Sequence, residues 1–364
     1  MKVLFDHKIF FLQKFGGISR YIFNLNKCFN QKINSKICAP IFVNQYIKDK
    51  NLQNISKHFY ISEIPRFTRT IIDNYNKFFF NSFYNKFKPD ILHLSYYEKN
   101  FRIKKKSKVV ITIYDLIYEK FYYEYGLKKR NFWKKDYIDN CDLIISISEN
   151  TKKDLVELYN VNPNKVEVVH LGTNFLNINK NVNVEKKNRE NYLLYVGDRK
   201  RYKNFQLLIK AFSASDVLKK NFQIFCCGSE KFNKNEIDYF QKLGIFEKIK
   251  FFYAQDNVLV NLYSNARSLI FPSKYEGFGL PLIEAMSLAC PVLASKTKIN
   301  QEILDNSAIY FKDNSFEDLR DVMEKNLFDD YKLESIKISG LKRSKKFTWE
   351  NCASQTIDLY KKIL

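Results

Sequence analysis

The sequence lacks any hydrophobic run that is long enough to span a membrane. A membrane-spanning helix needs about 18 consecutive apolar residues, whereas the apolar stretch at the start of the chain is limited to Val3–Phe5, before Asp6. We therefore expect neither a transmembrane helix nor a secretory signal sequence.

Disulfide and zinc-binding patterns are also missing. The seven cysteines are an odd number without a Cys-x-x-Cys pair, and the adjacent Cys226 and Cys227 are badly placed to bridge each other. The four histidines lie far apart and share no metal-ligand spacing with each other or with cysteine. We therefore expect reduced thiols in a cytosolic protein without a structural zinc site.

Negative charge is scarce, with 39 Asp and Glu against 61 Lys and Arg, which leaves a net charge of +22. Residues 1–172 carry +14 of this charge, and the rest of the chain carries +8. Such an excess favours an anionic partner, for example a nucleic acid or a membrane surface. A general bias of the sequence toward Lys, Asn, Ile, Phe and Tyr explains the lysines equally well, so both interpretations stay open.

Short apolar runs alternate with longer amphipathic stretches through both halves of the chain. This alternation is typical of strand–helix units around a parallel sheet, and 364 residues with 45% hydrophobic side chains suffice for two domains. We predict an α/β protein with two doubly wound, Rossmann-like domains. The expected strands span residues 2–6, 35–43, 91–94, 109–114, 143–146 and 166–169 in the first half, and 192–196, 223–227, 249–253, 268–272, 291–294 and 308–311 in the second.

A segment dominated by Asn and Lys separates the two halves. Residues 173–191 show no strong helical or strand periodicity, which predicts a linker. The predicted domains therefore span residues 1–172 and 192–346. Residues 347–364 are amphipathic and open near Thr348, and they predict a terminal helix.

One loop of the second half has the chemistry of an anion site. A predicted strand ends at Pro272, two glycines follow, and Pro281 stands where a helix begins that Pro291 would end. The N-terminus of such a helix offers free N–H groups and the positive end of its dipole to a phosphate. Because carboxylates repel phosphate, the nearby Glu276 and Glu284 suit the hydroxyls of a sugar or ribose. Taken singly, Glu284 could cap its helix and Glu276 could be solvated.

Two further strand ends carry residues that suit a phosphorylated ligand. Gly16 and Gly17 follow the first strand and let the backbone approach a ligand closely, although an ordinary strand–helix turn explains them as well. Arg199 and Lys203 follow the first strand of the second half, at the edge where open α/β sheets bind ligands. Two fixed cations there would neutralise a diphosphate.

The string Glu276–Glu284 resembles the E-x7-E signature of the retaining GT-B glycosyltransferases of family 4, a group 1 type. Residues 15–21, 146–155 and 195–204 resemble the family's N-terminal glycine loop, the helix start at the end of its first domain, and its phosphate-binding strand end. The resemblance implies two Rossmann-like domains that face each other across a cleft, and a C-terminal helix that crosses back to the first domain. It also implies transfer of a hexose, such as mannose or glucose, from a nucleotide diphosphate sugar to a saccharide in lipopolysaccharide, O-antigen or capsule assembly.

The same resemblance assigns roles to individual residues. Glu276 would bind the sugar hydroxyls beside the reacting centre, and Glu284 would bind the ribose. Arg199 and Lys203 would bind the diphosphate. The other residues implied for donor binding are Gly16, Gly17, Gly197, Asn204, Tyr253, Gly277, Phe278, Gly279 and Leu280.

Two of these assignments carry an alternative. The family usually places its arginine directly after the glycine, whereas Asp198 stands there in this chain, so the choice among Arg199, Lys200 and Arg201 stays open. Tyr253 would either stack on the nucleotide base or pack in the core, and the core is the favoured interpretation.

The first half departs from the family at one catalytic position. Similar sequences carry a His-Asp pair at the end of a strand of the first domain, facing the transferred sugar, where this chain has Tyr114-Asp115. Tyr114 can donate a hydrogen bond but cannot supply the charge of an imidazolium. Asp115 is explained equally well as a helix N-cap. We keep both residues as catalytic candidates.

The sequence contains no Asp-x-Asp triplet, which argues against a diphosphate bridged by a metal ion. Basic side chains and a helix N-terminus would neutralise the diphosphate instead, so we expect no metal and no cofactor beyond the donor substrate. Retention implies that the acceptor attacks from the face that the diphosphate leaves, and an oxygen of the leaving group could take its proton.

Aromatic and basic residues alternate in residues 74–88 and 128–135. One face of such a segment could lie on an anionic bilayer, which would suit a lipid-linked acceptor and a peripheral position on the inner face of the membrane. An amphipathic helix more often buries its apolar stripe in the core, and we favour that interpretation here.

Two other classes of function stay open. A GT-B phosphorylase or a nucleotide-sugar epimerase would share the predicted architecture. A nucleic-acid-binding protein would explain the charge, but the sequence has no helix-turn-helix, zinc-finger or RNA-binding signature, so we expect no nucleic-acid partner.

Overall fold

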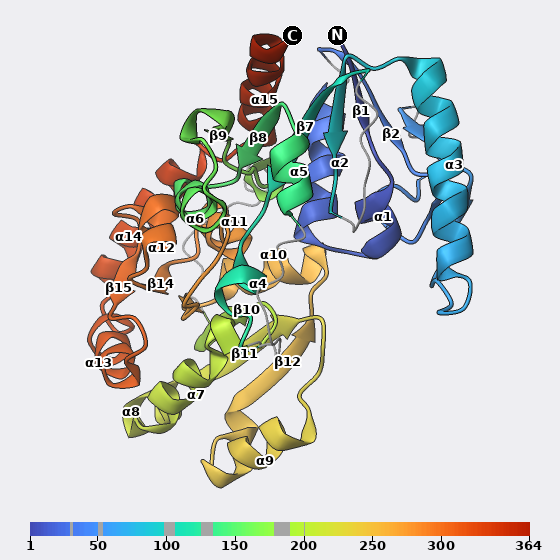
Figure 1. Ribbon diagram of the computed structural model, residues 1–364. Helices are drawn as coiled ribbons and strands as arrows, with labels where there is room; N and C mark the ends of the chain where they lie inside the picture. Colours follow the sequence, from blue (N-terminus) through green and yellow to red (C-terminus); the bar gives the residue numbers. More distant parts are fainter. Residues whose placement is uncertain (30–31, 50–53, 98–105, 125–133, 178–189, 200) are drawn as a thin grey trace. The chain divides into compact units, whose positions relative to one another are not determined.

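The chain folds into two compact units, each built around its own parallel β-sheet (Figure 1). The first unit comprises Met1–Gly172 and Trp349–Leu364, and the second comprises Thr173–Thr348. The structure is a computed structural model that describes all residues except 30–31, 50–53, 98–105, 125–133, 178–189 and 200. Most of the predicted linker and of the segment 128–135 therefore lies outside the described residues, while the predicted α/β fold is confirmed.

The sheet of the first unit has seven parallel strands, and its order reverses beside the first strand of the chain. From one edge to the other, the strands are β4 (Ile55–Ser56), β2 (Asn34–Cys38), β1 (Lys2–Phe5), β6 (Ile91–Leu94), β7 (Lys108–Ile113), β8 (Leu143–Ser146) and β9 (Val166–Val168). The helices of this unit are α1 (Lys8–Leu12), α2 (Gly17–Phe29), α3 (Arg69–Phe87), α4 (Ile117–Lys120), α5 (Lys135–Asn140), α6 (Glu149–Tyr159) and α15 (Trp349–Ile363).

One predicted strand, residues 35–43, is wrong as a single element. β2 ends at Cys38, and the next residues form β3 (Ile41–Phe42), which pairs with β5 (Phe59–Tyr60) in a separate two-stranded sheet. Pro40 separates the two strands because it has no N–H to donate to a ladder. Its carbonyl accepts the N–H groups of His58 and Phe59 at 2.8 and 2.9 Å, which joins the second sheet instead.

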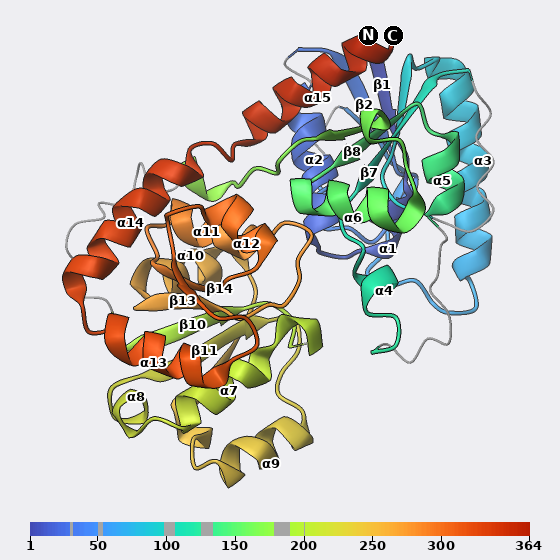
Figure 2. The ribbon, with the colours of Figure 1, turned by 60° about the vertical axis from the view of Figure 1, so that its left-hand side comes forward.

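Helices cover both faces of the first sheet (Figure 2). α2 and α15 pack against each other on one face, where the ring of Tyr360 contacts His93. α3 and α5 lie on the other face, where Phe80 and Tyr137 join a core cluster with Leu92. Neighbouring residues of a strand point to opposite faces of the sheet, so β6 contributes side chains to the cores on both faces. All four of its residues are buried.

A buried hydrogen-bond network fixes α15 to the first sheet. His93 Nδ1 pairs with the Tyr360 hydroxyl, and His93 Nε2 pairs with Thr112 Oγ1 at 2.8 Å. The Tyr21 hydroxyl reaches the same threonine oxygen at 3.2 Å. Burial lowers the pKa of His93 to about 3, so the imidazole is neutral in the folded protein.

The second unit repeats the plan with a six-stranded parallel sheet. Its strand order is β12 (Ile249–Tyr253), β11 (Gln223–Gly228), β10 (Tyr192–Val196), β13 (Ser268–Phe271), β14 (Val292–Ser295) and β15 (Ile309–Phe311). All six strands lie within one residue of the sequence prediction. The helices are α7 (Phe205–Ser213), α8 (Asp216–Asn221), α9 (Lys234–Lys242), α10 (Asp256–Asn265), α11 (Leu280–Ser287), α12 (Lys298–Leu304), α13 (Phe316–Asn326) and α14 (Asp330–Ser344).

Helix ends in both units follow local sequence signals. Ser148 starts α6 by accepting the Thr151 N–H, and Asn233 with Glu236 forms a capping box on α9. The prediction that Pro291 ends α11 is wrong by several residues, because the helix stops at Ser287. Among the described residues, no helix combines the length and apolar character that crossing a bilayer requires.

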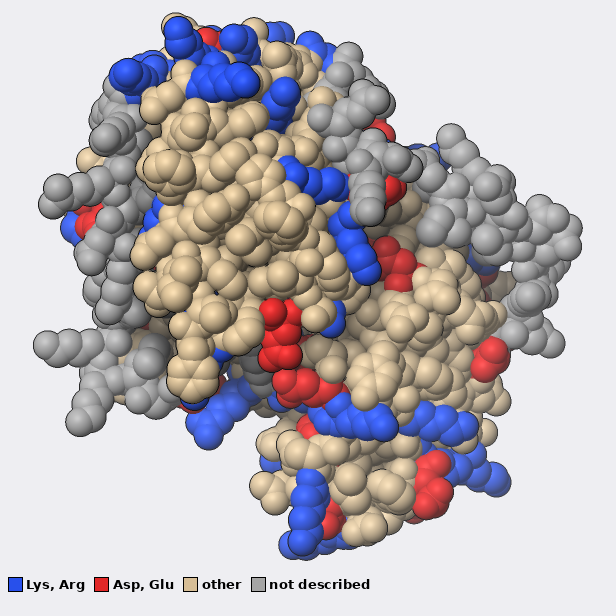
Figure 3. All heavy atoms as spheres, turned by 90° about the vertical axis from the view of Figure 1, so that its right-hand side faces the viewer, with Lys and Arg blue, Asp and Glu red and all other residues tan. Residues whose placement is uncertain are grey.

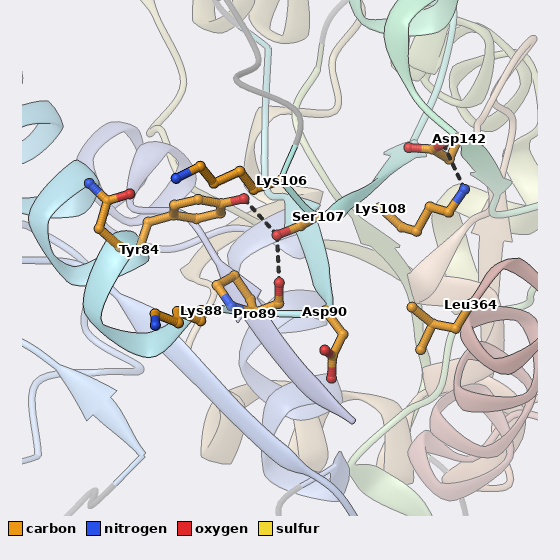
Figure 4. Close-up of a pocket in the computed structure, with 10 residues that line it drawn as sticks. Tyr84, Lys88, Pro89, Asp90, Lys106, Ser107, Lys108, Asp142 and Leu364 are labelled. Atoms are coloured by element: carbon orange, nitrogen blue, oxygen red, sulfur yellow. Dashed lines mark hydrogen bonds and ion pairs between the residues drawn. The ribbon is translucent and has the colours of Figure 1, made fainter.

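A hollow of about 830 Å³ lies at the amino edge of the first sheet, beside the end of α3 (Figure 4). The Tyr84 hydroxyl pairs with Ser107 Oγ at 2.6 Å, and Ser107 donates to the Pro89 carbonyl. Parallel α/β sheets bind their ligands at the opposite, carboxyl edge. This hollow is therefore not the candidate active site.

The buried His93 makes the first unit sensitive to acid. An unfolded histidine has a pKa of about 6.5, and the folded value is lower, so the unfolded state binds more protons below that pH. The stability that His93 contributes is complete above about pH 6.5 and declines as the pH falls toward 3, by roughly 1.4 kcal/mol per pH unit.

Urea unfolding measured between pH 7 and pH 5 checks this prediction. Trp349 belongs to the first unit and is buried, so its fluorescence follows the unfolding of that unit. We expect His93→Gln to flatten the pH dependence, whereas the matched control at the exposed His58, His58→Gln, keeps the wild-type slope. Equal slopes for all three proteins would contradict the assignment.

Candidate active site

The strand order of the large sheet in each unit reverses once, and this reversal marks where a ligand would bind. The strand order reverses between β1 and β6 in the first unit and between β10 and β13 in the second. Ligands of open α/β sheets bind outside the carboxyl ends of the strands at such a reversal. Gly197 follows β10 and Glu276 lies in the loop after β13, so the predicted donor residues lie at the reversal of the second sheet.

A buried ion pair joins the two loops at this reversal. The Lys203 ammonium contacts both carboxylate oxygens of Glu276, at 2.7 and 2.9 Å. Glu276 is only 6% exposed, and the backbone N–H of Lys274 donates to the Tyr202 carbonyl at 2.9 Å as a second link. The structure thus brings together two of the predicted site residues, one cationic and one anionic. The alternative in which Glu276 is solvated is therefore wrong, because its side chain is buried.

Glycine is required where the ends of β10 and β11 approach each other. Gly197 has a φ of 136°, and its N–H donates to the Cys227 carbonyl at 2.9 Å. A Cβ on Gly228 would lie 2.9 Å from the Gly197 carbonyl oxygen, closer than real contacts allow. Gly228 was not among the predicted residues, although its place at a strand end could have indicated it.

α11 begins in a loop that only glycine can close. Gly279 is the N-cap residue with a φ of 97°, and a Cβ there would approach the Leu282 side chain to 2.9 Å. Gly277, Phe278 and Leu280 complete the turn, and the Phe278 ring is buried. The helix therefore directs the positive end of its dipole toward the carboxyl edge that carries Glu276.

Glu284 lies within α11 and is held by a neighbouring helix. The Tyr263 hydroxyl of α10 donates to Glu284 Oε2 at 3.2 Å, and Glu284 is 6% exposed. Burial and then the nearby carboxylate raise the pKa of Tyr263 well above 10, so Tyr263 stays a donor. No acidic side chain lies in the first turn of α11, so Glu284 lies farther along the helix than the sequence placed it. Tyr263 was missed because helical spacing alone marks it as a core residue.

Arg199 is bound to a different part of the second unit. Its guanidinium makes two bonds to Glu236, Nε to Oε1 at 2.6 Å and Nη2 to Oε2 at 3.1 Å. It also donates to the carbonyls of Glu230 and Lys231 at 2.9 and 2.8 Å. These bonds order the loop before α9. Of the alternatives, Arg201 is exposed, and Lys200 lies outside the described residues.

Asn204 and Tyr253 keep polar or aromatic groups available for a ligand. Asn204 has a φ of 56° at the start of α7, and its buried Nδ2 has no partner among the described residues. A buried donor without an acceptor is costly, and a ligand oxygen would satisfy it. Tyr253 is 52% exposed at the end of the edge strand β12, so the prediction that it packs in the core is wrong.

The glycine loop of the first unit is partly closed by a side chain. α2 begins at Gly17, and the Ser19 N–H donates to Gln13 Oε1 at 3.3 Å. A Cβ on Gly16 would lie 2.3 Å from that same oxygen, so the glycine is needed for Gln13 to reach the helix start. Both explanations of Gly16 and Gly17, a tight turn and a ligand cradle, fit this geometry.

Tyr114 and Asp115 follow β7 and both use their side chains locally. The buried Tyr114 hydroxyl donates to the Ser95 carbonyl at 3.3 Å, and burial raises its pKa well above 10. Asp115 Oδ1 accepts the Ile117 N–H at 3.1 Å, but the N-cap residue of α4 is Leu116, so the alternative in which Asp115 is the N-cap is wrong. Both residues line a small pocket of about 50 Å³ together with Ile18, Tyr96, Tyr97, Tyr118 and Lys134.

A second buried ion pair holds the Asp115 loop. Lys134 Nζ donates to the Asp115 carbonyl at 2.8 Å and contacts Glu119 at 3.0 Å. The Tyr159 hydroxyl donates to Glu119 at 2.9 Å, and Glu119 is fully buried. The sequence hid this pair, because Lys134 belongs to a segment whose lysines suggested a basic surface.

Comparison with known proteins agrees with the resemblance. The model of Glycosyltransferase Family 4 matches residues 15–175, and that of Glycosyl transferases group 1 matches residues 177–343. The chain is 27% identical to O-antigen chain mannosyltransferase B of Escherichia coli over 62% of its length, and 30% identical to O-antigen chain mannosyltransferase RfbU of Salmonella typhimurium over 55%. The aligned parts span 61% and 55% of those relatives.

The fold is shared with a solved structure along the whole chain. Anabaena Alr3699/HepE, determined in complex with UDP-glucose, superimposes with a TM-score of 0.73 at 13% identity and covers 100% of both chains. An identity this low supports the fold alone. Because the two family matches together run from residue 15 to residue 343, the chain belongs to the family 4 and group 1 glycosyltransferases, with the GT-B fold.

Proposed function

We propose that the protein is a glycosyltransferase that moves a hexose from a nucleotide diphosphate sugar to a saccharide in O-antigen or lipopolysaccharide assembly. The observation that carries the proposal is the buried Lys203–Glu276 pair at the strand-order reversal of the second sheet. The relatives' names give O-antigen mannosyl transfer, and the HepE structure holds UDP-glucose in the same fold. Mannose and glucose are therefore the hexoses to test first.

The second unit supplies the groups that such a donor needs. Lys203 uses two of its three N–H donors on Glu276, so one remains for a diphosphate oxygen. The start of α11 adds its dipole to the neutralisation of the leaving group. The Glu276 carboxylate binds sugar hydroxyls. Glu284, oriented by Tyr263, binds the ribose.

Four donor residues act through the backbone or through weaker contacts. Gly197 and Gly279 let the chain approach the donor, Asn204 offers its unpartnered amide, and Tyr253 stacks on the base. The role of Arg199 also differs from the sequence prediction. Because Glu236 and two carbonyls occupy its guanidinium, we assign it to ordering the loop before α9 and leave the diphosphate to Lys203.

We propose transfer with retention and without a metal ion. The acceptor oxygen bonds to the anomeric carbon while the bond from that carbon to the diphosphate oxygen breaks. The acceptor's proton passes to an oxygen of the leaving diphosphate on the same face. This route requires no protein base, which suits a first unit in which burial keeps Tyr114 protonated.

The first unit supplies a tyrosine-lined pocket for the acceptor. At about 50 Å³, the pocket at Asp115 has room for little more than one water, so it would hold a single exocyclic group of a sugar. The Asp115 carboxylate keeps acceptor capacity beyond its bond to Ile117 and can bind a sugar hydroxyl. A lipid-linked acceptor would suit the charge of this half, which is +14 over residues 1–172.

Substitution of the ion pair tests the donor assignment. We expect Lys203→Met and Glu276→Gln each to lower kcat/KM for sugar transfer by at least about 100-fold, because preorganised charge at a leaving group contributes on that scale. Radiolabelled transfer from UDP- and GDP-linked glucose and mannose measures it. Lys337→Met is the matched control, because it breaks the ion pair with Glu334 on α14.

Retained wild-type transfer in folded Lys203→Met and Glu276→Gln proteins would refute the assignment. Release of sugar phosphate only when phosphate is added would show a phosphorylase instead, and donor isomerisation without acceptor would show an epimerase.

Substitution of Arg199 separates loop ordering from donor binding. Arg199→Met leaves the Glu236 carboxylate without its cation, so we expect the free energy of unfolding to fall by about 1–3 kcal/mol. Transfer measured well below the melting temperature should change less than about fivefold. A loss as large as that in Lys203→Met, with unaltered stability, would return Arg199 to the diphosphate.

A further inference from the structure

The outer face of α3 is apolar and exposed, although the sequence favoured burial of its aromatic stripe. Phe67, Ile71, Tyr75 and Phe78 are 94%, 69%, 40% and 75% exposed. Ile71, Tyr75 and Phe78 are four and three residues apart, which puts them on one face of α3, and Phe67 lies in the turn before the helix. Within the predicted segment 74–88 the core-facing helix is confirmed for Phe79, Phe80, Phe83, Tyr84 and Phe87, whereas Tyr75 and Phe78 stay exposed.

An excess of aromatic residues explains the exposed row. The inward face of α3 is already occupied, because Phe79, Phe83, Tyr84 and Phe87 pack against the core of the first unit. The helix is therefore anchored without the outer row. Phe59 in β5 is 62% exposed and extends the apolar area through His58, whose ring contacts Phe79 at 4.0 Å.

The exposed charges between residues 66 and 88 are positive. Arg66 and Arg69 are exposed at its start, and Lys86 is exposed near its end. Between residues 66 and 88 the one carboxylate is Asp73, which is turned inward. Asp73 pairs with Lys8 at 3.0 Å and Lys77 at 3.1 Å and is 17% exposed, so no negative side chain interrupts the outer face.

The exposed row belongs to the half of α3 nearest the carboxyl edge of the sheet. α3 leads into β6, which starts at the amino edge, so α3 itself starts at the carboxyl edge. The contact of Lys8, just after β1, with Asp73 agrees with this direction. Tyr114 and Asp115 follow β7 at the same edge.

We propose that the outer face of α3, from Arg66 to Lys86, docks the protein on an anionic lipid bilayer. Apolar rings flanked by arginine and lysine, without carboxylates, match a surface of acyl chains below anionic headgroups. Figure 3 views the side on which α3 lies, where uncharged side chains form a broad area on the first unit. Docking here would bring the carboxyl edge of the first sheet, with the pocket at Asp115, close to a lipid-linked saccharide. Only this link to the acceptor rests on the proposed function.

Vesicle flotation of the full chain tests the surface. We expect binding to phosphatidylcholine vesicles that contain phosphatidylglycerol, and weak binding to phosphatidylcholine alone. The Ile71→Ser/Phe78→Ser protein should partition at least about tenfold less, because two inserted side chains are lost. Arg66→Gln/Arg69→Gln should lose about fivefold per charge, and the loss should shrink as salt is raised.

Matched controls use exposed apolar residues of the second unit. Val217→Ser/Tyr331→Ser removes side chains that are 50% and 92% exposed, and it should float like the wild type. Unfolding midpoints of all variants confirm that they are folded. Transfer to a water-soluble acceptor should be unchanged in Ile71→Ser/Phe78→Ser, which separates failure of this proposal from failure of the glycosyltransferase assignment.

Three results would overturn the membrane assignment. The first is flotation of the Ile71→Ser/Phe78→Ser protein at the wild-type level, and the second is no flotation of the wild type on anionic vesicles. The third is sedimentation that shows a dimer of the wild type and a monomer of the variant, since a second copy of the chain would then cover this face.

Discussion

The candidate donor site depends on one interaction, the buried ion pair between Lys203 and Glu276. Removal of either partner would leave a charge in a buried setting without its counter-charge, which is strongly unfavourable. Because the pair spans the loops after β10 and β13, it fixes their separation. The close backbone approach at Gly197 and the start of α11 at Gly279 are then held around the same point.

The first unit uses the same device with different residues. The carboxylate of Asp6 accepts bonds from the N–H and the hydroxyl of Ser95, which joins the ends of β1 and β6 at the strand reversal. Lys134 and Glu119 form a buried pair that holds the Asp115 loop. In both units the sheet supplies a rigid edge, and a few buried polar contacts set the loops that would meet substrate. The outer face of α3 is separate from these loops, so a partner could bind there without a change in the sheet or in the loops.

Periodicity and glycine spacing made the framework predictable from the sequence. Buried parallel strands read as short apolar runs, so the strands of the second sheet were placed within one residue. Pro281 and Gly279 marked the start of α11, and the two glutamates were found because their spacing resembles a family signature. Each of these features is encoded by residues that are close together in the sequence, so it can be recognised without knowledge of the tertiary structure.

The sequence was less informative about the tertiary contacts of individual side chains. The contact of Arg199 with Glu236 was not foreseen, because nothing in the sequence shows that α9 would bring Glu236 to it. Tyr253 was expected in the core because edge strands cannot be told from central ones by pattern alone. Tyr75 and Phe78 are exposed although the pattern of residues 74–88 favoured burial, because amphipathic patterns do not show how many aromatic residues one sheet face can accept. Strand order and packing capacity are properties of the whole unit.

A crystal structure of the protein with its nucleotide sugar tests the central claim most directly. The account predicts a diphosphate oxygen within about 3 Å of Lys203 Nζ, sugar hydroxyls on the Glu276 carboxylate, and the ribose at Glu284. A donor bound away from residues 197–204 and 276–284, with the Lys203–Glu276 pair untouched, would contradict it.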